Sequence, residues 1–184
     1  MKLNKRIIFL SLFIFLSLSN IFSLNADELV RKFIAGNLSD KVSVLKQVPG
    51  SGAETFLTES SFAFVSNYYT LLENDADFKN LVLETIKNAG PKTSEKNIYT
   101  IQRIYTYFDD ENIKVAVINK IPELTGDLSE LIQLVNEYVK KTLKDDPDYQ
   151  NSIMFSNAVH TLALCSDSSS FDVLSGLFLL LSLY

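Results

Sequence analysis

A regular interval between polar turns is the feature that most constrains the fold of this chain. The predicted second helices of successive helix pairs begin near Asp40, Asp77, Asn112 and Asp148, at intervals of 37, 35 and 36 residues. Intervals of this size are typical of helical-hairpin repeats. One hairpin cannot bury its apolar stripe alone, whereas stacked hairpins share a continuous core. The interval therefore predicts a row of stacked helix pairs.

Two of these units also share sequence. The segment "KVSVLKQVPG" at 41–50 and the segment "KVAVINKIPE" at 114–123 have Lys, Val, Val and Pro in common. They lie 73 residues apart, which is about twice the interval between turns. We interpret the echo as a repeat.

Hydrophobic spacing predicts helices throughout and no strand, because no alternating apolar run lies between paired turn signals. The predicted helix pairs are 27–48, 54–89, 95–124 and 127–164, and a further C-terminal helix follows them without a partner. Ile118 and Leu131 lie on the apolar stripes and are expected in the core. The predicted fold class is all-α, an α-solenoid of about four stacked antiparallel helical hairpins plus that unpaired helix.

The segment "DENIKVAVINKI" at 110–121 resembles the second half of a HEAT-type repeat. In that family an acidic turn precedes a branched aliphatic residue, a basic residue, and then small and aliphatic residues. The matching positions here are Asp110, Ile113, Lys114, Ala116 and Ile121, and partly Lys41, Val42, Ser43 and Val48. The other two units match in hydrophobic spacing alone, so the resemblance covers about half of 27–184. A tetratricopeptide-like repeat stays open, although its Trp-Leu-Gly-Tyr pattern is missing from this sequence.

Residues 1–26 have the pattern of a signal peptide, and 27–184 form the predicted repeat domain. A basic start precedes the uncharged apolar run 7–18, and Ala26 suits the position before a cleavage site. The alternatives are cleavage after Ser23, a buried core helix, and an uncleaved inner-membrane anchor at 7–24, whose length approaches the roughly 20 residues that span a bilayer. The signal-peptide interpretation predicts an exported protein, periplasmic or extracellular, and the anchor interpretation predicts one held at the inner membrane.

The chain is acidic, which excludes some classes of partner. Its net charge is −5, and loss of Lys2, Lys5 and Arg6 with the leader would make it −8. No cluster of Lys and Arg follows the leader. We expect no binding to nucleic acid or to anionic membrane surfaces.

The residues that most often carry chemistry form no recognisable site. His160 is the only histidine and is expected to be a partly buried packing residue. Cys165 is the only cysteine and cannot form an internal disulfide. The acidic run 145–148 lacks the alternating ligands and glycine of a calcium loop and is interpreted as a solvated turn. We predict no catalytic, cofactor-binding or metal-ligating residue, and no cofactor.

Tyrosines at helical spacing leave two interpretations open. The set could form an aromatic binding surface, but aromatic residues at this spacing are more often core residues. Its members are Tyr68, Tyr69, Tyr99, Tyr105 and Tyr107.

The C-terminal segment Phe171–Tyr184 is strongly apolar, with Asp172 as its single charge. We expect a helix that packs Phe171, Leu174 and Phe178 against 127–164 and leaves Leu179 and Leu183 uncovered. Uncovered leucines favour self-association, contact with a membrane, or a longer native product.

These observations predict an exported, non-catalytic scaffold that binds another protein. A membrane-tethered structural component that keeps its leader is the alternative. A helical hydrolase that uses His160 is a third hypothesis.

Overall fold

The computed structural model describes residues 25–145, 148, 152–165 and 167–181. Residues 25–35 are helical, and a 3₁₀ helix, η1, follows α6. The remaining helices are α2 (Leu38–Leu45), α3 (Glu54–Tyr68), α4 (Ala76–Lys87), α5 (Glu95–Tyr107), α6 (Glu111–Lys120), η1 (Ile121–Glu123), α7 (Ser129–Asp145), α8 (Ile153–Cys165) and α9 (Ser168–Leu181). The described residues contain no strand, so the all-α prediction is confirmed for them. None of the described helices combines the length and the apolar character that crossing a bilayer requires.

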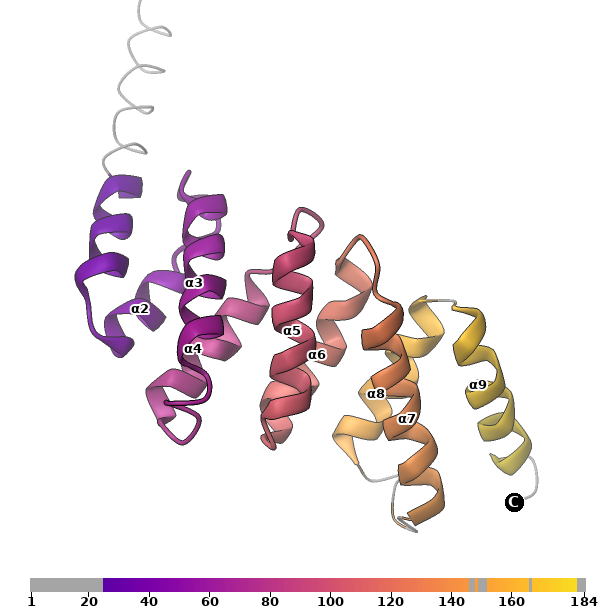
Figure 1. Cartoon of the computed structure of the whole chain (residues 1–184). Coiled ribbons are helices and arrows are strands. Elements are labelled where there is room, and N and C mark those ends of the chain that lie inside the picture. The colour runs from indigo at the N-terminus through magenta and orange to yellow at the C-terminus, as the bar shows by residue number, and fades with distance from the viewer. Residues whose placement is uncertain (1–24, 146–147, 149–151, 166, 182–184) are drawn as a thin grey trace, which may run out of the picture.

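The helices form a row of two layers (Figure 1). In one layer α4 packs between α2 and α6, and α6 packs between α4 and α8. In the layer nearer the viewer α3 packs against α5, and α7 packs against α9. Each of α3, α5 and α7 also packs against the helix that follows it, so the core lies between the layers. Ile118 and Leu131 are fully buried, which confirms their prediction as core residues.

We call the layer of α2, α4, α6 and α8 the inner row. Acidic and amide side chains cap the starts of its first three helices, as the turn pattern predicted. Asn37 and Asp40 form a capping box at α2, and Asp75 accepts from the backbone N–H of Phe78 at 2.9 Å. Asp110 accepts from the first backbone N–H groups of α6. These bonds satisfy donors that have no partner within the helix. The observed helices begin at residues 38, 76 and 111, within two residues of the predicted turns.

The predicted start of the last inner helix is wrong. We expected it near Asp148, but α8 begins at Ile153, so the last interval is 42 residues. The Ser152 hydroxyl accepts from the N–H of Phe155 at 3.2 Å and caps this helix instead. Pro147, a residue type that suits the first position of a helix, lies outside the described residues. An acidic turn can precede a helix by several residues, and the cap is then a less conspicuous serine.

Side chains of one inner helix bond to the end of the previous one. Asn88 at the end of α4 donates to the Leu45 carbonyl at 3.0 Å. Thr161 in α8 donates to the Ile118 carbonyl at 3.1 Å, in a buried position. Both bonds join residues 43 positions apart. Each carbonyl also accepts from a backbone N–H at the end of its own helix, and the side-chain bond adds a link to the neighbouring helix.

Lys41 is a buried lysine that closes the end of the first helical segment. Its ammonium group donates to the carbonyls of Phe33, Ile34 and Gly36, the last at 2.9 Å. It also lies 5.1 Å from the Phe33 ring centroid and 5.4 Å from that of Phe64. A cation at a helix C-terminus is favourable for the helix dipole. Burial lowers the pKa of Lys41, against the opposing charge of Asp40.

The additional C-terminal helix is present as α9, but the face that it buries differs from our prediction. It packs against α7 and α8, as expected for a helix that covers 127–164. Its buried residues are Ser170, Val173 and Leu177, whereas Phe171 and Phe178 are exposed and Leu174 is half-buried. Leu179 is exposed as expected, and Leu183 lies outside the described residues.

The cause of this difference is a polar contact between α7 and α9. The amide nitrogen of Asn136 donates to the hydroxyls of Ser169 and Ser170, at 3.2 and 3.3 Å. This contact directs the serines toward α7 and turns Phe171 and Phe178 outward. A buried amide nitrogen without a partner would be costly, so this contact favours the observed rotation of the helix, in which Val173 and Leu177 are also buried.

Candidate functional site

The candidate catalytic and metal-ligating residues are separate in space or remain solvated. His160 is exposed on α8, so the prediction of a partly buried packing histidine is wrong. Cys165 is half-buried at the end of that helix, and burial together with Asp167 raises the pKa of its thiol. Asp148 is exposed, as a solvated turn requires. Among the described residues no three or more His, Cys, Asp and Glu side chains gather as a metal site.

The tyrosines divide between core and surface. Tyr69 and Tyr105 are buried, and burial beside Tyr138 raises the pKa of Tyr105 to about 12. Tyr99 is 56% exposed and Tyr107 is 40% exposed. The interpretation of the whole set as core residues therefore holds for two tyrosines and fails for the others.

Arg103 joins buried Tyr69 to exposed Tyr99. Its guanidinium carbon lies 5.0 Å from the ring centroid of Tyr69 and 5.8 Å from that of Tyr99. One guanidinium nitrogen also donates to the Tyr69 hydroxyl. Attraction between a cation and the faces of aromatic rings stabilises this arrangement. The guanidinium is therefore fixed by its neighbours although it remains exposed.

A second ring contact closes the cluster on its other side. Tyr107 meets the Tyr69 ring edge to face, with ring centroids 4.8 Å apart. A hydrogen bond to Glu73 raises the pKa of Tyr107, and burial and the charge of Glu73 act in the same direction. We call Tyr69, Tyr99, Arg103 and Tyr107 the Tyr–Arg cluster.

Helix geometry explains why these side chains meet. Tyr99, Arg103 and Tyr107 follow one another at a spacing of four on α5, so they share one face of that helix. Tyr69 comes from the end of α3, which packs beside α5. The sequence analysis grouped the tyrosines without Arg103, although the spacing of four between Tyr99, Arg103 and Tyr107 places all three on one helix face. The contribution of Tyr69 depends on the packing of two helices.

The Tyr–Arg cluster borders a cavity of about 290 Å³ whose far wall carries Glu130 of α7. A second cavity of about 610 Å³ lies further along the same two helices and is lined by Tyr105, Leu134 and Tyr138, among others. Thr106 lines both cavities. The helices α5 and α7 do not pack closely against each other. The two cavities are neighbours along α5 and α7, and we call them together the α5/α7 groove.

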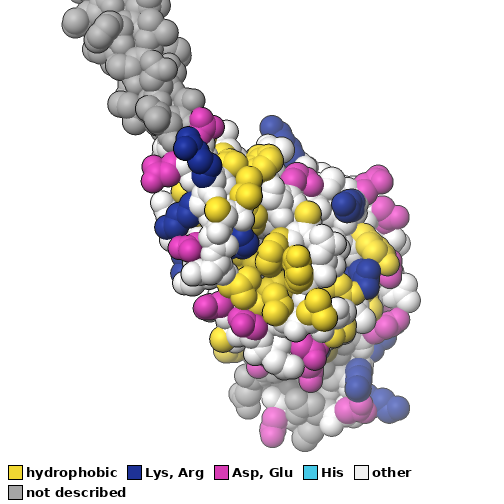
Figure 2. Space-filling view, turned by 60° about the vertical axis from the view of Figure 1, so that its left-hand side comes forward, with side chains coloured by type: hydrophobic (Ala, Val, Ile, Leu, Met, Phe, Trp, Pro, Cys, Tyr) yellow, Lys and Arg dark blue, Asp and Glu magenta, His cyan; other side chains and the backbone are white. Residues whose placement is uncertain are grey.

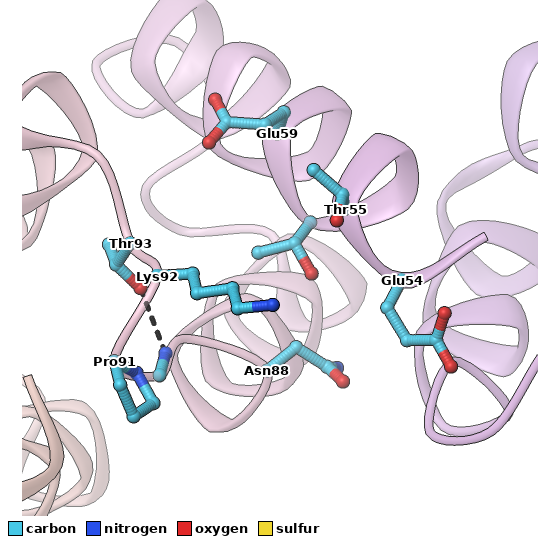
Figure 3. Close-up of a pocket in the computed structure, with 9 residues that line it drawn as sticks. Glu54, Thr55, Glu59, Asn88, Pro91, Lys92 and Thr93 are labelled. Atoms are coloured by element: carbon cyan, nitrogen blue, oxygen red, sulfur yellow. Dashed lines mark hydrogen bonds between the residues drawn. The ribbon is translucent and has the colours of Figure 1, made fainter. Parts of the chain in front are cut away.

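Another cavity, of about 460 Å³, lies between the start of α3 and the turn after α4. Figure 3 shows Lys92 extending across it from the turn that carries Pro91 and Thr93. The Thr93 hydroxyl accepts from the N–H of Gly90 at 2.8 Å and fixes this turn. Hydrogen bonds from the backbone N–H groups of Glu54 itself and of Gly52 lower the pKa of the Glu54 carboxyl at the edge of the cavity. No aromatic residue lines this cavity.

Apolar side chains also gather on the N-terminal side of the row (Figure 2). Exposed apolar side chains of this part of the chain include Ile34, Phe56 and Leu71. Large exposed apolar patches often mark contact surfaces.

The chain matches no family model, no curated protein and no solved structure. The geometry of the described residues is therefore what supports an assignment. The Tyr–Arg cluster can stack on an apolar group and can donate hydrogen bonds to an anion. His160 lines none of the cavities described above.

Proposed function

We propose that this protein is an exported, non-catalytic scaffold that binds another protein. The Tyr–Arg cluster is the observation that carries the proposal. Tyr and Arg are the residue types that, together with Trp, most often supply the binding energy of protein interfaces. Here Tyr99, Arg103 and Tyr107 are exposed, yet the cluster is held by ring contacts and by the bond from Arg103 to buried Tyr69. Little side-chain entropy remains to be lost when a partner binds, which favours affinity.

We further propose that the scaffold is an α-solenoid of about four HEAT-like hairpins. The sequential packing of α2, α4, α6 and α8 supports this architecture. So do the polar caps at Asn37, Asp75 and Asp110, which recur at the starts of three of these helices. The basic positions of the resemblance differ, because Lys41 closes a helix end while Lys114 pairs with Asp109 at 3.1 Å. Repeat arrays of this kind present extended surfaces on one layer.

Partner capture tests the proposed function. The protein carries a photo-crosslinking amino acid at Tyr99 and is expressed in its native host, and crosslinked species are identified by mass spectrometry. We expect one protein to dominate, and a matched probe at exposed Glu123 should not capture it. Failure of Tyr99 to crosslink any protein more than Glu123 does would refute the proposal.

A second candidate activity is self-association through α9. Phe171 and Phe178 are 70% and 73% exposed on one side of this helix, and Leu179 lies beside them. Burying one such side chain contributes about 1.5–3 kcal/mol, so two copies that cover this side would gain from several. We propose a second copy of the chain as its occupant. Sedimentation velocity should show a dimer that Phe178→Glu converts to monomer, and a monomeric wild type at high concentration would contradict this.

A further inference from the structure

We propose that the α5/α7 groove binds a partner segment in which a carboxylate stands next to an aromatic or other apolar side chain, with Arg103 as the group that receives the carboxylate. This inference rests on the proposed function, because it names the chemistry of the partner and the place where it binds.

The first argument is the free hydrogen-bonding capacity of Arg103. A guanidinium has five N–H donors, and the Tyr69 hydroxyl accepts from one guanidinium nitrogen. None of the ion pairs found among the described residues includes Arg103. The remaining donors suit a carboxylate, whose two oxygens accept from the guanidinium in parallel.

The second argument is the position of the aromatic rings. Tyr99 and Tyr107 stand one helical turn before and one turn after Arg103 on the same face of α5, and both are partly exposed. A carboxylate that reaches Arg103 therefore brings its neighbouring side chain against one of these rings. An apolar or aromatic side chain gains from that contact, and a strongly hydrated one does not.

The third argument is the charge across the groove. Glu130 lines the same cavity as Arg103. The cavity beyond it is lined by Lys114 and Lys141 as well as by Asp109, Glu111 and Glu137, so its charges largely offset one another. The Glu130 carboxylate repels a group of high negative charge beside Arg103. The groove thus favours a single carboxylate over a phosphate or a nucleic-acid strand, as the net charge of −5 also does.

The site can be tested without a known partner by using phenylacetate, which places a carboxylate next to an aromatic ring. Phenylacetamide has the same shape without the charge. Each is titrated into the isotope-labelled protein, purified as its expression host processes it, and the signals of the Arg103 Nε–Hε group and of the Tyr99 and Tyr107 rings are followed by NMR. We expect saturable shifts with phenylacetate and binding of phenylacetamide that is about tenfold weaker, because a charge-assisted hydrogen bond is lost.

Three variants sharpen the assay. Arg103→Lys keeps the charge but not the planar fork, and it should weaken phenylacetate about tenfold. Glu130→Gln removes a competing carboxylate and should tighten binding severalfold. Lys32→Gln removes one exposed positive charge from the first helical segment, which lines neither cavity of the groove, and should change affinity by less than about twofold, as distant surface charges are screened. Thermal unfolding checks that each variant is folded.

Several outcomes would overturn the proposal. Equal binding of phenylacetate and phenylacetamide would remove the role of the charge, and unchanged affinity in Arg103→Lys and Arg103→Gln would remove the role of Arg103. Tighter binding of phenylphosphate than of phenylacetate would contradict the argument from Glu130. The crosslinking assay separates the two levels of inference. If Arg103→Gln captures the same protein as wild type, the scaffold function stands and this site assignment fails, whereas no capture by wild type defeats the function itself.

Discussion

Replacing Ile118 by Ala tests whether the two layers share one closely packed core. Ile118 is fully buried in α6, which packs against α4 on one side, α8 on the other, and α5 across the layers. Ile→Ala removes three carbon atoms, and a buried methylene contributes about 0.8 kcal/mol, so the transfer term is about 2.4 kcal/mol. Because α6 is held from three directions, the space can close only partly, and a cavity term is added. We expect a loss of about 3–4 kcal/mol in unfolding free energy.

Urea unfolding followed by far-UV circular dichroism measures this loss. The dependence of the free energy on urea concentration should stay constant, because the surface exposed on unfolding hardly changes. Ile34→Ala is the matched control, since the Ile34 side chain is 65% exposed and its truncation should change stability by less than about 0.5 kcal/mol. A loss below about 1 kcal/mol for Ile118→Ala, or equal losses for both variants, would show that α6 is not enclosed as described.

Four further changes have defined outcomes. Lys41→Met keeps the apolar stem but leaves carbonyls at the end of the first helical segment without the ammonium donor, so the urea midpoint should fall by the equivalent of about 2 kcal/mol. An unchanged midpoint would show that water replaces the ammonium group. Thr161→Val should cost about 1 kcal/mol in the same assay, because the Ile118 carbonyl loses a buried donor. Asn37→Ala removes a helix cap and should cost about 1 kcal/mol, with Asn37→Ser close to wild type. The pKa of Tyr105 is raised to about 12, so the stability due to its neutral phenol is complete below pH 10 and is lost as the pH rises toward 12. Tyr105→Phe should reduce this decline in unfolding free energy. Equal declines with pH in Tyr105→Phe and wild type would contradict the assignment.

The repeat interval predicted the helices well because both of its components are local. Apolar spacing fixes which residues can share a buried face, and an acidic or amide residue satisfies the first N–H groups of a helix. The predictions near Asp40, Asp77 and Asn112 therefore fall within two residues of the observed starts. At α8 the same reasoning failed, because Asp148 is conspicuous in the sequence whereas Ser152 is the residue that caps the helix.

Features that depend on distant contacts were not predictable in the same way. The outward rotation of Phe171 follows from bonds between Asn136 and serines more than 30 residues away. The cluster around Arg103 requires Tyr69, which comes from the neighbouring helix. A prediction from apolar spacing alone was wrong for the face of α9 and for the exposed tyrosines, because it assigned aromatic residues to the core. It also took no account of polar side chains that orient a helix.

The unequal packing of the two layers gives the row a direction in which it bends most easily. The layer of α4, α6 and α8 is continuous and is reinforced by Thr161 across α6 and α8, so its length is nearly fixed. The separation of α5 and α7 involves few contacts and can change at small cost. A molecule that fills the α5/α7 groove would therefore set the separation of α5 and α7. Because the length of the opposite layer stays constant, a change in this separation changes the curvature of the row.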